Sequence, residues 1–323
     1  MDAEQEIYPS DAKTVVLPPE TPAVISDPAG RTGASEFPAG ATTLEPGCVV
    51  RNLRILNRLS EGGMGELWLC HPLEEVGVRR VLKVLKQETA ASADGRARFR
   101  REGHLLLRFR HENIVRTYDA WSEGDSEFIL MEYVSGMDLG RMVRAHCEFT
   151  AEYGVYMLQV LAETFGYAWD TLRLLHRDIK PSNIMISDDN VLKVLDFGVA
   201  KSLEQNGGTV ITMAGMTLGS PGFMSPEQCF SPEKIGCSSD IFSLGATVYY
   251  CLSGGALPYP GGNLPEIVAA MRKGKPPPLC RLNPAIPRQL SELVMAMVAA
   301  NPEQRPSSWE ELLSAIARCG GAV

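Results

Sequence analysis

The stretch HRDIKPSNIMISDDNVLKVLDFG, residues 176–198, contains two short motifs that decide how the rest of the chain is interpreted. The first is HRD, followed by Lys180 and Asn183, and the second is DFG, which begins at Asp196. Phosphoryl transfer from a nucleotide needs a carboxylate that orients the attacking hydroxyl, and oxygen ligands that hold a divalent metal on the phosphates. Asp178 is the candidate for the first task, and Asn183 and Asp196 are candidates for the second. Either tripeptide could occur by chance, but both together at this separation indicate phosphoryl transfer.

Lys180, two residues after Asp178, completes a pattern that resembles the eukaryotic-type (Hanks-type) serine/threonine protein kinase family. The segments SEGGMGELW, SPEQ and NPEQRPSSWEELLSAI are most similar to its bacterial branch. The resemblance covers about residues 47–319 and implies an α+β, bilobal fold. The N-lobe, about residues 47–134, would hold a small antiparallel sheet with one main helix, and the C-lobe, about residues 135–319, would be mainly helical.

The resemblance also implies a reaction and a role for each motif residue. The γ-phosphoryl group of ATP would pass, with Mg²⁺, to Ser or Thr hydroxyls of protein substrates, including the chain itself by autophosphorylation. Asp178 would orient the hydroxyl, Lys180 would neutralise charge on the moving group, and Lys83 would hold the α- and β-phosphates. Asn183 and Asp196 would hold the metal.

The segment LSEGGMGELW, residues 59–68, resembles the glycine-rich loop of the family, in which backbone N–H groups approach phosphate oxygens. Gly62 and Gly65 match two of its glycines, and Ser60 stands where a third usually lies. An ordinary hairpin turn is the alternative interpretation. Its position just before a lysine-bearing strand favours the phosphate loop.

Two lysines on the following strand, Lys83 and Lys86, compete for the phosphate-binding role. The family pairs this lysine with a helix glutamate, which Glu102 in the segment FRRE matches. Lys83 fits by its distance from Gly65 and from Glu102, so we expect a Lys83–Glu102 ion pair, with Lys86 in solvent.

The remaining nucleotide-binding positions follow from the resemblance alone. Leu67 and Val81 would cover the adenine, where the family usually has the smaller valine and alanine. The other expected contacts lie in FILMEYVSGMDL: Met131 as gatekeeper, the backbone groups of Glu132 and Val134 at the adenine edge, and Asp138 at the ribose.

Structural and regulatory positions are implied in the same way. Glu227 and Arg305 would form a buried pair, and Asp240 would brace the backbone of the HRD segment. Arg177, directly before Asp178, is typical of kinases that are activated when a phosphate on the activation loop recruits the arginine. The candidate phosphorylation sites are Thr212, with Thr209 and Thr217 as alternatives.

The first 46 residues differ from the rest in composition. They hold seven prolines, eight acidic and two basic residues, so their charge of −6 accounts for most of the −8 of the whole chain. Such a segment buries too little apolar surface to offset its ordering entropy, and we expect an acidic, Pro-rich, disordered tail over residues 1–46. Its threonines suggest a phosphothreonine-binding partner, and a passive solubilising tail is the alternative.

Composition also excludes several classes of function. The remaining charge is too small for a basic nucleic-acid-binding face. The eight cysteines form no CxxC pair, which favours free thiols in a cytoplasmic protein over a zinc site or disulfides. The uncharged stretch 241–263 is interrupted by glycine and proline, and indicates a buried helix followed by a loop rather than a membrane span.

Periodicity predicts the order of the elements. Short alternating runs indicate strands, and recurrence of apolar residues at three and four indicates helices. The expected strands are residues 51–59, 66–70, 81–85, 127–134 and 192–195, and the expected helices are 95–109, a core helix containing Val155 to Trp169, 240–253, 264–272, 287–299 and 308–318.

Two other functions remain compatible with these residues. A pseudokinase scaffold would bind nucleotide and partners without turnover, and Ser60, Leu67 and Val81 favour it. A small-molecule kinase of similar fold is the other alternative, against which stand the Glu227–Arg305 pair and the SPGF segment.

Overall fold

The computed structural model describes residues 44–62, 65–75, 77–85, 93–124, 126–197 and 221–320. The described chain forms two compact units that divide between Ser135 and Gly136. The N-terminal unit is rich in strands and the C-terminal unit is mainly helical. The predicted α+β class and the predicted order of the two parts are therefore confirmed.

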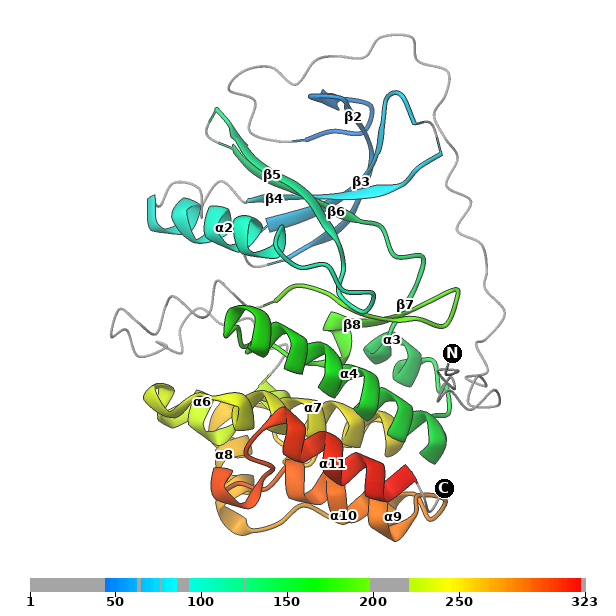
Figure 1. Ribbon diagram of the computed structural model, residues 1–323, viewed down its shortest axis with the longest axis vertical. Coiled ribbons are helices and arrows are strands. Elements are labelled where there is room, and N and C mark those ends of the chain that lie inside the picture. The colour runs from blue at the N-terminus through cyan, green and yellow to red at the C-terminus, as the bar shows by residue number, and fades with distance from the viewer. Residues whose placement is uncertain are drawn as a thin grey trace, which may run out of the picture. The chain divides into compact units, whose positions relative to one another are not determined.

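The N-terminal unit contains a six-stranded antiparallel sheet with the order β1-β2-β3-β4-β6-β5, against which helix α2 packs (Figure 1). The strands predicted from alternation correspond to β2, β3, β4 and β6, and the predicted helix corresponds to α2. The sequence did not indicate β1, which has two residues, or β5, whose TYDAWSE lacks a clear apolar alternation. The bounds are β1 Val49–Val50, β2 Leu53–Glu61, β3 Gly65–Pro72, β4 Arg80–Leu85, α2 Ala93–Leu106, β5 Thr117–Glu123 and β6 Ser126–Glu132.

Both faces of this sheet are covered by apolar side chains. One face carries the cluster Leu53, Ile55, Trp68, Leu82 and Phe128, together with Leu44, Cys48, Val50 and Cys70. The other, on the side of α2, carries Val81, Leu85, Ile129 and Met131, which cluster with Phe99 of α2. Leu44 is only 6% exposed, so the folded domain includes it and begins before Gly47. This corrects the predicted boundary of the tail, of which residues 1–43 lie outside the described residues.

The C-terminal unit is built around α7, in which every residue from Ser239 to Tyr249 is buried. Helix α7 packs against α4 and α10, and α4 packs against α11 (Figure 1). The helical bounds are α3 Leu139–Arg144, α4 Ala151–Leu172, α6 Pro226–Phe230, α7 Cys237–Leu252, α8 Leu264–Lys273, α9 Leu279–Leu282, α10 Arg288–Met297 and α11 Trp309–Gly320. The predicted core helix is α4, and the four later predictions correspond to α7, α8, α10 and α11.

Three short strands and several single 3-10 turns complete this unit. Strands β7 Gly136–Asp138, β8 Ile184–Ser187 and β9 Leu192–Val194 form an antiparallel sheet in that order. The predicted strand before DFG is therefore confirmed as β9. The 3-10 turns are η1 Pro181–Asn183, η3 Pro221–Phe223, η4 Pro232–Lys234 and η5 Pro302–Gln304.

The uncharged stretch 241–263 begins inside α7 and continues into a loop, as the sequence predicts. The buried hydroxyl groups of Ser243 and Thr247 are satisfied within the helix, because Ser243 donates to the carbonyl of Ser239 at 3.2 Å and Thr247 donates to that of Ser243 at 2.8 Å. Of the helices in the described part of the chain, none combines the length and the apolar character needed to cross a membrane.

Candidate active site

A buried ion pair joins β4 to α2 in the N-terminal unit. Lys83 Nζ lies 2.9 Å from Glu102 Oε1, and the two side chains are only 11% and 4% exposed. The sequence-predicted pair is thus formed. Removing one partner would leave the other charge buried, which typically costs about 3–5 kcal/mol. Lys86, the competing lysine, lies outside the described residues.

Leu67 and Val81, predicted to cover adenine, lie in one cluster with Met131, the predicted gatekeeper. Val81 and Met131 belong to one buried cluster, and Leu67 packs against it. Val134 is also buried. The backbone N–H of Glu132 donates to the carbonyl of Arg116 at 2.8 Å, which aligns the end of β6 with the start of β5.

The two predicted loop glycines flank residues 63–64, which lie outside the described residues. Gly62 N–H donates to the Gly65 carbonyl at 2.8 Å. A Cβ on Gly65 would lie 2.4 Å from the carbonyl oxygen of Val84, so β3 and β4 approach here more closely than any side chain permits. Gly65 therefore has a packing reason to be glycine, in addition to the phosphate-binding role that the sequence predicts.

The residues of the HRD segment and its continuation meet in the C-terminal unit. Lys180 Nζ lies 2.9 Å from Asp178 Oδ2, with the side chains 20% and 17% exposed. Asn183 Nδ2 donates to the Asp178 carbonyl at 2.9 Å and to Asp178 Oδ2 at 3.1 Å. One carboxylate is thus fixed by an ammonium and an amide while still being partly open to solvent.

The backbone of this segment is held by α6 and α7. Asp240 accepts hydrogen bonds from the N–H groups of His176 at 2.7 Å and Arg177 at 2.9 Å. Gln228 Nε2 donates to the Arg177 carbonyl at 2.9 Å. Burial raises the pKa of Asp240 to about 6, although these N–H groups and the charge of Arg177 favour its ionised form. These are the backbone contacts expected of Asp240 from the sequence.

The β8–β9 hairpin places the DFG segment beside the HRD segment. Asn183 directly precedes β8 and Asp196 lies just after β9, so both are at the same end of this antiparallel pair. The Leu195 N–H donates to the Asn183 carbonyl at 2.8 Å. Phe197 is buried, and its ring lies 4.7 Å from that of His176. The two motifs that begin the sequence argument are therefore joined by backbone and aromatic contacts.

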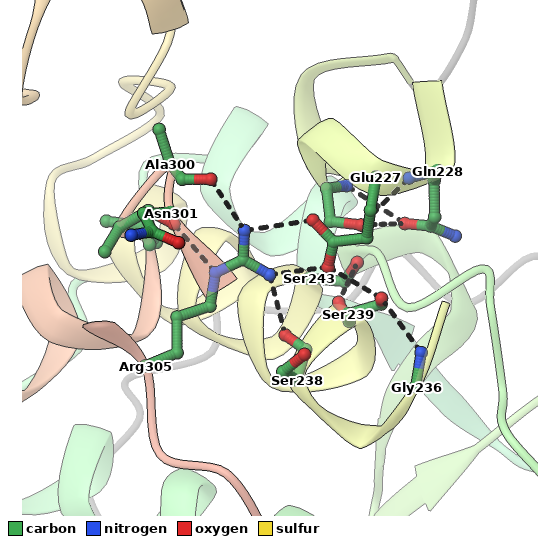
Figure 2. Close-up of polar contacts among 12 residues, drawn as sticks. Glu227, Gln228, Gly236, Ser238, Ser239, Ser243, Ala300, Asn301 and Arg305 are labelled. Carbon is green, nitrogen blue, oxygen red and sulfur yellow. Dashed lines mark hydrogen bonds and ion pairs between the residues drawn. The ribbon is translucent and has the colours of Figure 1, made fainter. Parts of the chain in front are cut away.

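A second buried ion pair joins α6 to the segment before α11 (Figure 2). Arg305 donates to both carboxylate oxygens of Glu227, at 2.6 and 3.1 Å, with side-chain exposures of 0% and 3%. Arg305 also donates to three backbone carbonyls, those of Ser238, Ala299 and Ala300. Burial alone would raise the pKa of Glu227, but hydrogen bonding and the charge of Arg305 outweigh it and lower the pKa.

Other predicted positions have different outcomes. Asp138 caps α3, accepting from the Arg141 N–H at 2.9 Å, which gives it a structural role beside the predicted ribose contact. Thr209, Thr212 and Thr217 lie outside the described residues. Gln228 was not predicted as a site residue, although Ser225 and Gln228 form a capping box that the SPEQ spelling could have indicated.

The cysteines form no second site. All eight lie in the described residues and are free. Burial raises the pKa of the Cys70 thiol to about 12 and of the Cys229 and Cys237 thiols to about 11, so these thiols are protonated at neutral pH. Among the described residues, no group of three or more His, Cys, Asp or Glu side chains could hold a metal ion.

A strand-rich unit with a buried Lys–Glu pair and a helical unit with joined HRD and DFG segments define a protein kinase domain. The model of the protein kinase domain family matches residues 53–315, and the chain belongs to this family.

Curated relatives include the serine/threonine-protein kinase pkn2 of Myxococcus xanthus, 33% identical over 84% of this chain and 32% of the relative. Another is PrkC of Bacillus subtilis, 30% identical over 80% of this chain and 39% of the relative. The chain thus spans about a third of the length of these relatives.

Solved structures share the fold. The kinase domain of Mycobacterium tuberculosis PknI superposes with a TM-score of 0.64 at 22% identity, covering 85% of this chain and 98% of that one. The apo form of PpkA-294 gives a TM-score of 0.69 at 21% identity, and the match covers 85% of this chain and 100% of that one. The predicted kinase fold is confirmed.

Proposed function

We propose that the chain is an active serine/threonine protein kinase that transfers the γ-phosphoryl group of ATP to protein hydroxyls. The observation that carries the proposal is the Asp178 carboxylate, held by Lys180 and Asn183 on a backbone that Asp240 fixes. Family membership implies the use of ATP. The names of the relatives in Myxococcus and Bacillus support Ser or Thr as the acceptor.

In this proposal Asp178 accepts a hydrogen bond from the acceptor hydroxyl and takes up its proton late in the transfer. Lys180, which already lies beside this carboxylate, neutralises negative charge that develops on the transferred group. Both side chains are partly exposed, so a substrate can reach them. Lys83 holds the α- and β-phosphates, and Glu102 keeps its ammonium in place.

The residues at the end of the β8–β9 hairpin suit Mg²⁺. The side-chain amide nitrogen of Asn183 donates to Asp178, so the carbonyl oxygen of the same amide is the atom that could bind a metal. Asp196 supplies a carboxylate. Mg²⁺ prefers oxygen ligands and is usually held by one or two protein groups together with substrate phosphates. The metal would neutralise charge on the phosphates, and Asn183 and Asp196 would hold it.

Regulation and location belong to the same proposal. Phosphorylation of Thr212, or of Thr209 or Thr217, by the chain itself would recruit Arg177 and favour the active form. We further propose a cytoplasmic location, protein substrates, and a phosphothreonine-binding partner for the tail, because tethering in the same chain raises the local concentration of its threonines as acceptors.

Mass spectrometry of the purified chain, wild type against Asp178→Asn, tests the proposal. The wild type with ATP and Mg²⁺ should gain phosphate on Ser or Thr, and Asp178→Asn should gain none while its melting temperature still rises with ATP. Transfer at a near-normal rate by Asp178→Asn would overturn the assignment of Asp178. A wild type that binds ATP but transfers nothing would establish the pseudokinase alternative.

A further inference from the structure

A second charged contact, apart from the Lys83–Glu102 pair, fixes α2 on the sheet of the N-terminal unit. Arg100 Nε and Nη2 lie 2.8 and 2.5 Å from the same oxygen of Glu127, Oε1. Ser122 Oγ donates to the other oxygen, Oε2, at 2.6 Å. The Glu127 side chain is 2% exposed, whereas that of Arg100 is 52% exposed. A buried carboxylate at the start of β6 thus reaches a helix residue at the surface.

Because Glu127 is buried, its contact with Arg100 favours the position of α2 that is packed against the sheet. A carboxylate removed from water needs a charged partner and hydrogen bonds to offset its lost hydration. In the described residues, Arg100 supplies the charge and Ser122 supplies a hydrogen bond. Ser122 pairs with Glu127 across the β5–β6 hairpin, so of these two contacts of Glu127 it is the one with Arg100 that restrains the helix. Movement of α2 away from the sheet would leave the carboxylate with the hydroxyl alone.

Gly103, three residues after Arg100, provides a second anchor point. A Cβ at this position would lie 2.7 Å from Ala120 Cβ and 3.2 Å from Ile129 Cγ1, so the helix touches the sheet closely here. Ala120 pairs with Ile129 in the same hairpin. On β6, Ile129 and Glu127 are two residues apart, about 7 Å, and lie on the same face. Two points along one strand therefore define the position of α2 along the sheet.

The ion pair between Glu102 and Lys83, the proposed phosphate-binding lysine, depends on this position of α2. Glu102 directly precedes Gly103, and its partner Lys83 pairs with Ile129 across β4 and β6. Consecutive helix residues thus lie over neighbouring sheet residues. We propose that Glu127 and Arg100 are positioning residues, which hold α2 where Glu102 meets Lys83. The inference rests on the proposed kinase function for its kinetic consequence, but not for its structural one.

The adjacent arginine offers a matched control. Arg101 is exposed on the same helix, so Arg100→Gln and Arg101→Gln make the same substitution one residue apart. We expect Arg100→Gln and Glu127→Gln to lower kcat/KM for ATP about ten-fold, since small displacements at a reacting centre cost up to about a hundred-fold. Arg101→Gln should stay within about two-fold of wild type, as surface changes usually do. All variants are assayed well below their melting temperatures.

A double-mutant cycle separates positioning from general stability. If Glu127 acts through Glu102, then Glu127→Gln should cause little further loss once Glu102→Gln is present. Independent, multiplying losses would overturn the proposal, as would equal effects of Arg100→Gln and Arg101→Gln.

Hydrogen exchange of the ATP-free chain provides a readout that does not need activity. Amides of α2 should exchange faster in Arg100→Gln than in Arg101→Gln, with those of β6 unchanged. Equal exchange in both would refute the anchoring. Absence of any transfer by the wild type would contradict the proposed function instead, and the exchange result would still decide the role of the pair.

Discussion

Replacing Arg305 with methionine tests whether the buried pair in the C-terminal unit is as important as its geometry indicates. Methionine keeps much of the length and apolar volume of arginine but removes its charge and donors. Glu227 would keep one side-chain donor among the described residues, Ser239 Oγ at 2.7 Å, and three carbonyls would lose the guanidinium. Removing one partner of such a pair costs about 3–5 kcal/mol.

This cost converts into a measurable change of melting temperature. For a unit of about 150–250 residues, each kcal/mol lowers the melting temperature by about 2–4 °C. We therefore expect Arg305→Met to melt about 6–20 °C below wild type in calorimetry. The matched control is Arg288→Met, because Arg288 forms an equally short contact with Glu292, 2.7 Å, while the two side chains are 86% and 62% exposed.

Exposed pairs of this kind contribute little, so Arg288→Met should melt close to wild type. Similar melting temperatures for the two variants would refute the argument that burial gives the Glu227–Arg305 pair its importance.

The pH dependence of stability supplies a second check. Because the folded-state pKa of Glu227 is lowered, its contribution is present above the unfolded value of about 4.3 and is lost as pH falls through the lowered pKa. The stability difference between wild type and Glu227→Gln should therefore shrink as pH falls below about 4.

Three further predictions concern the rest of the chain. Lys83→Met should reduce phosphate transfer by at least about a hundred-fold and Lys86→Met should not, since Lys83 forms the pair with Glu102; like effects in a transfer assay would reassign the lysine. Deleting residues 1–43 should leave the melting temperature unchanged, whereas a deletion that also removes Leu44 should lower it, because Leu44 is buried. Thr212→Ala should lower activity toward an added substrate, and full activity in a radiolabel assay would exclude phosphorylation of Thr212 as the switch.

The sequence predicted groupings of residues that are close together in the chain or that belong to a recognisable family motif. Asp178 and Asn183 are five residues apart and were assigned to one site from that spacing, and the structure adds a hydrogen bond between their side chains. The pairing of Glu227 with Arg305 spans 78 residues and was expected only because the resemblance supplies it. Helices with strong apolar periodicity, such as α4, were placed to within a few residues, because burial of one helix face sets that pattern within a single segment.

Contacts made by the backbone or by isolated residues could not be predicted. Gln228 reaches the carbonyl of Arg177, 51 residues away, and a backbone acceptor leaves no mark in the sequence. Leu44 is a single apolar residue at the end of a polar, Pro-rich segment, and composition averaged over that segment concealed it. Glu127 looks like an exposed strand residue until α2 brings Arg100 to it.

The backbone at Arg177 shows why the catalytic loop needs distant support. Its φ is +61°, in the left-handed region, which costs a non-glycine residue about 1–3 kcal/mol. Asp240 and Gln228 hold this conformation by bonding the N–H groups of His176 and Arg177 and the carbonyl of Arg177. The orientation of the next residue, the proposed catalytic carboxylate, therefore depends on two helices that come later in the chain.

Helices α6 and α7 are fixed to each other by the residues that directly precede Gln228 and Asp240. Glu227 directly precedes Gln228 and Ser239 directly precedes Asp240, and the Ser239 hydroxyl donates to Glu227 at 2.7 Å. Arg305 closes this arrangement from the C-terminal end by donating to Glu227 (Figure 2). In each adjacent pair, one side chain joins the helices together and the other holds the catalytic loop. Loss of the Arg305 contact should therefore slow transfer even in protein that remains folded, because the two loop anchors would no longer be fixed relative to each other.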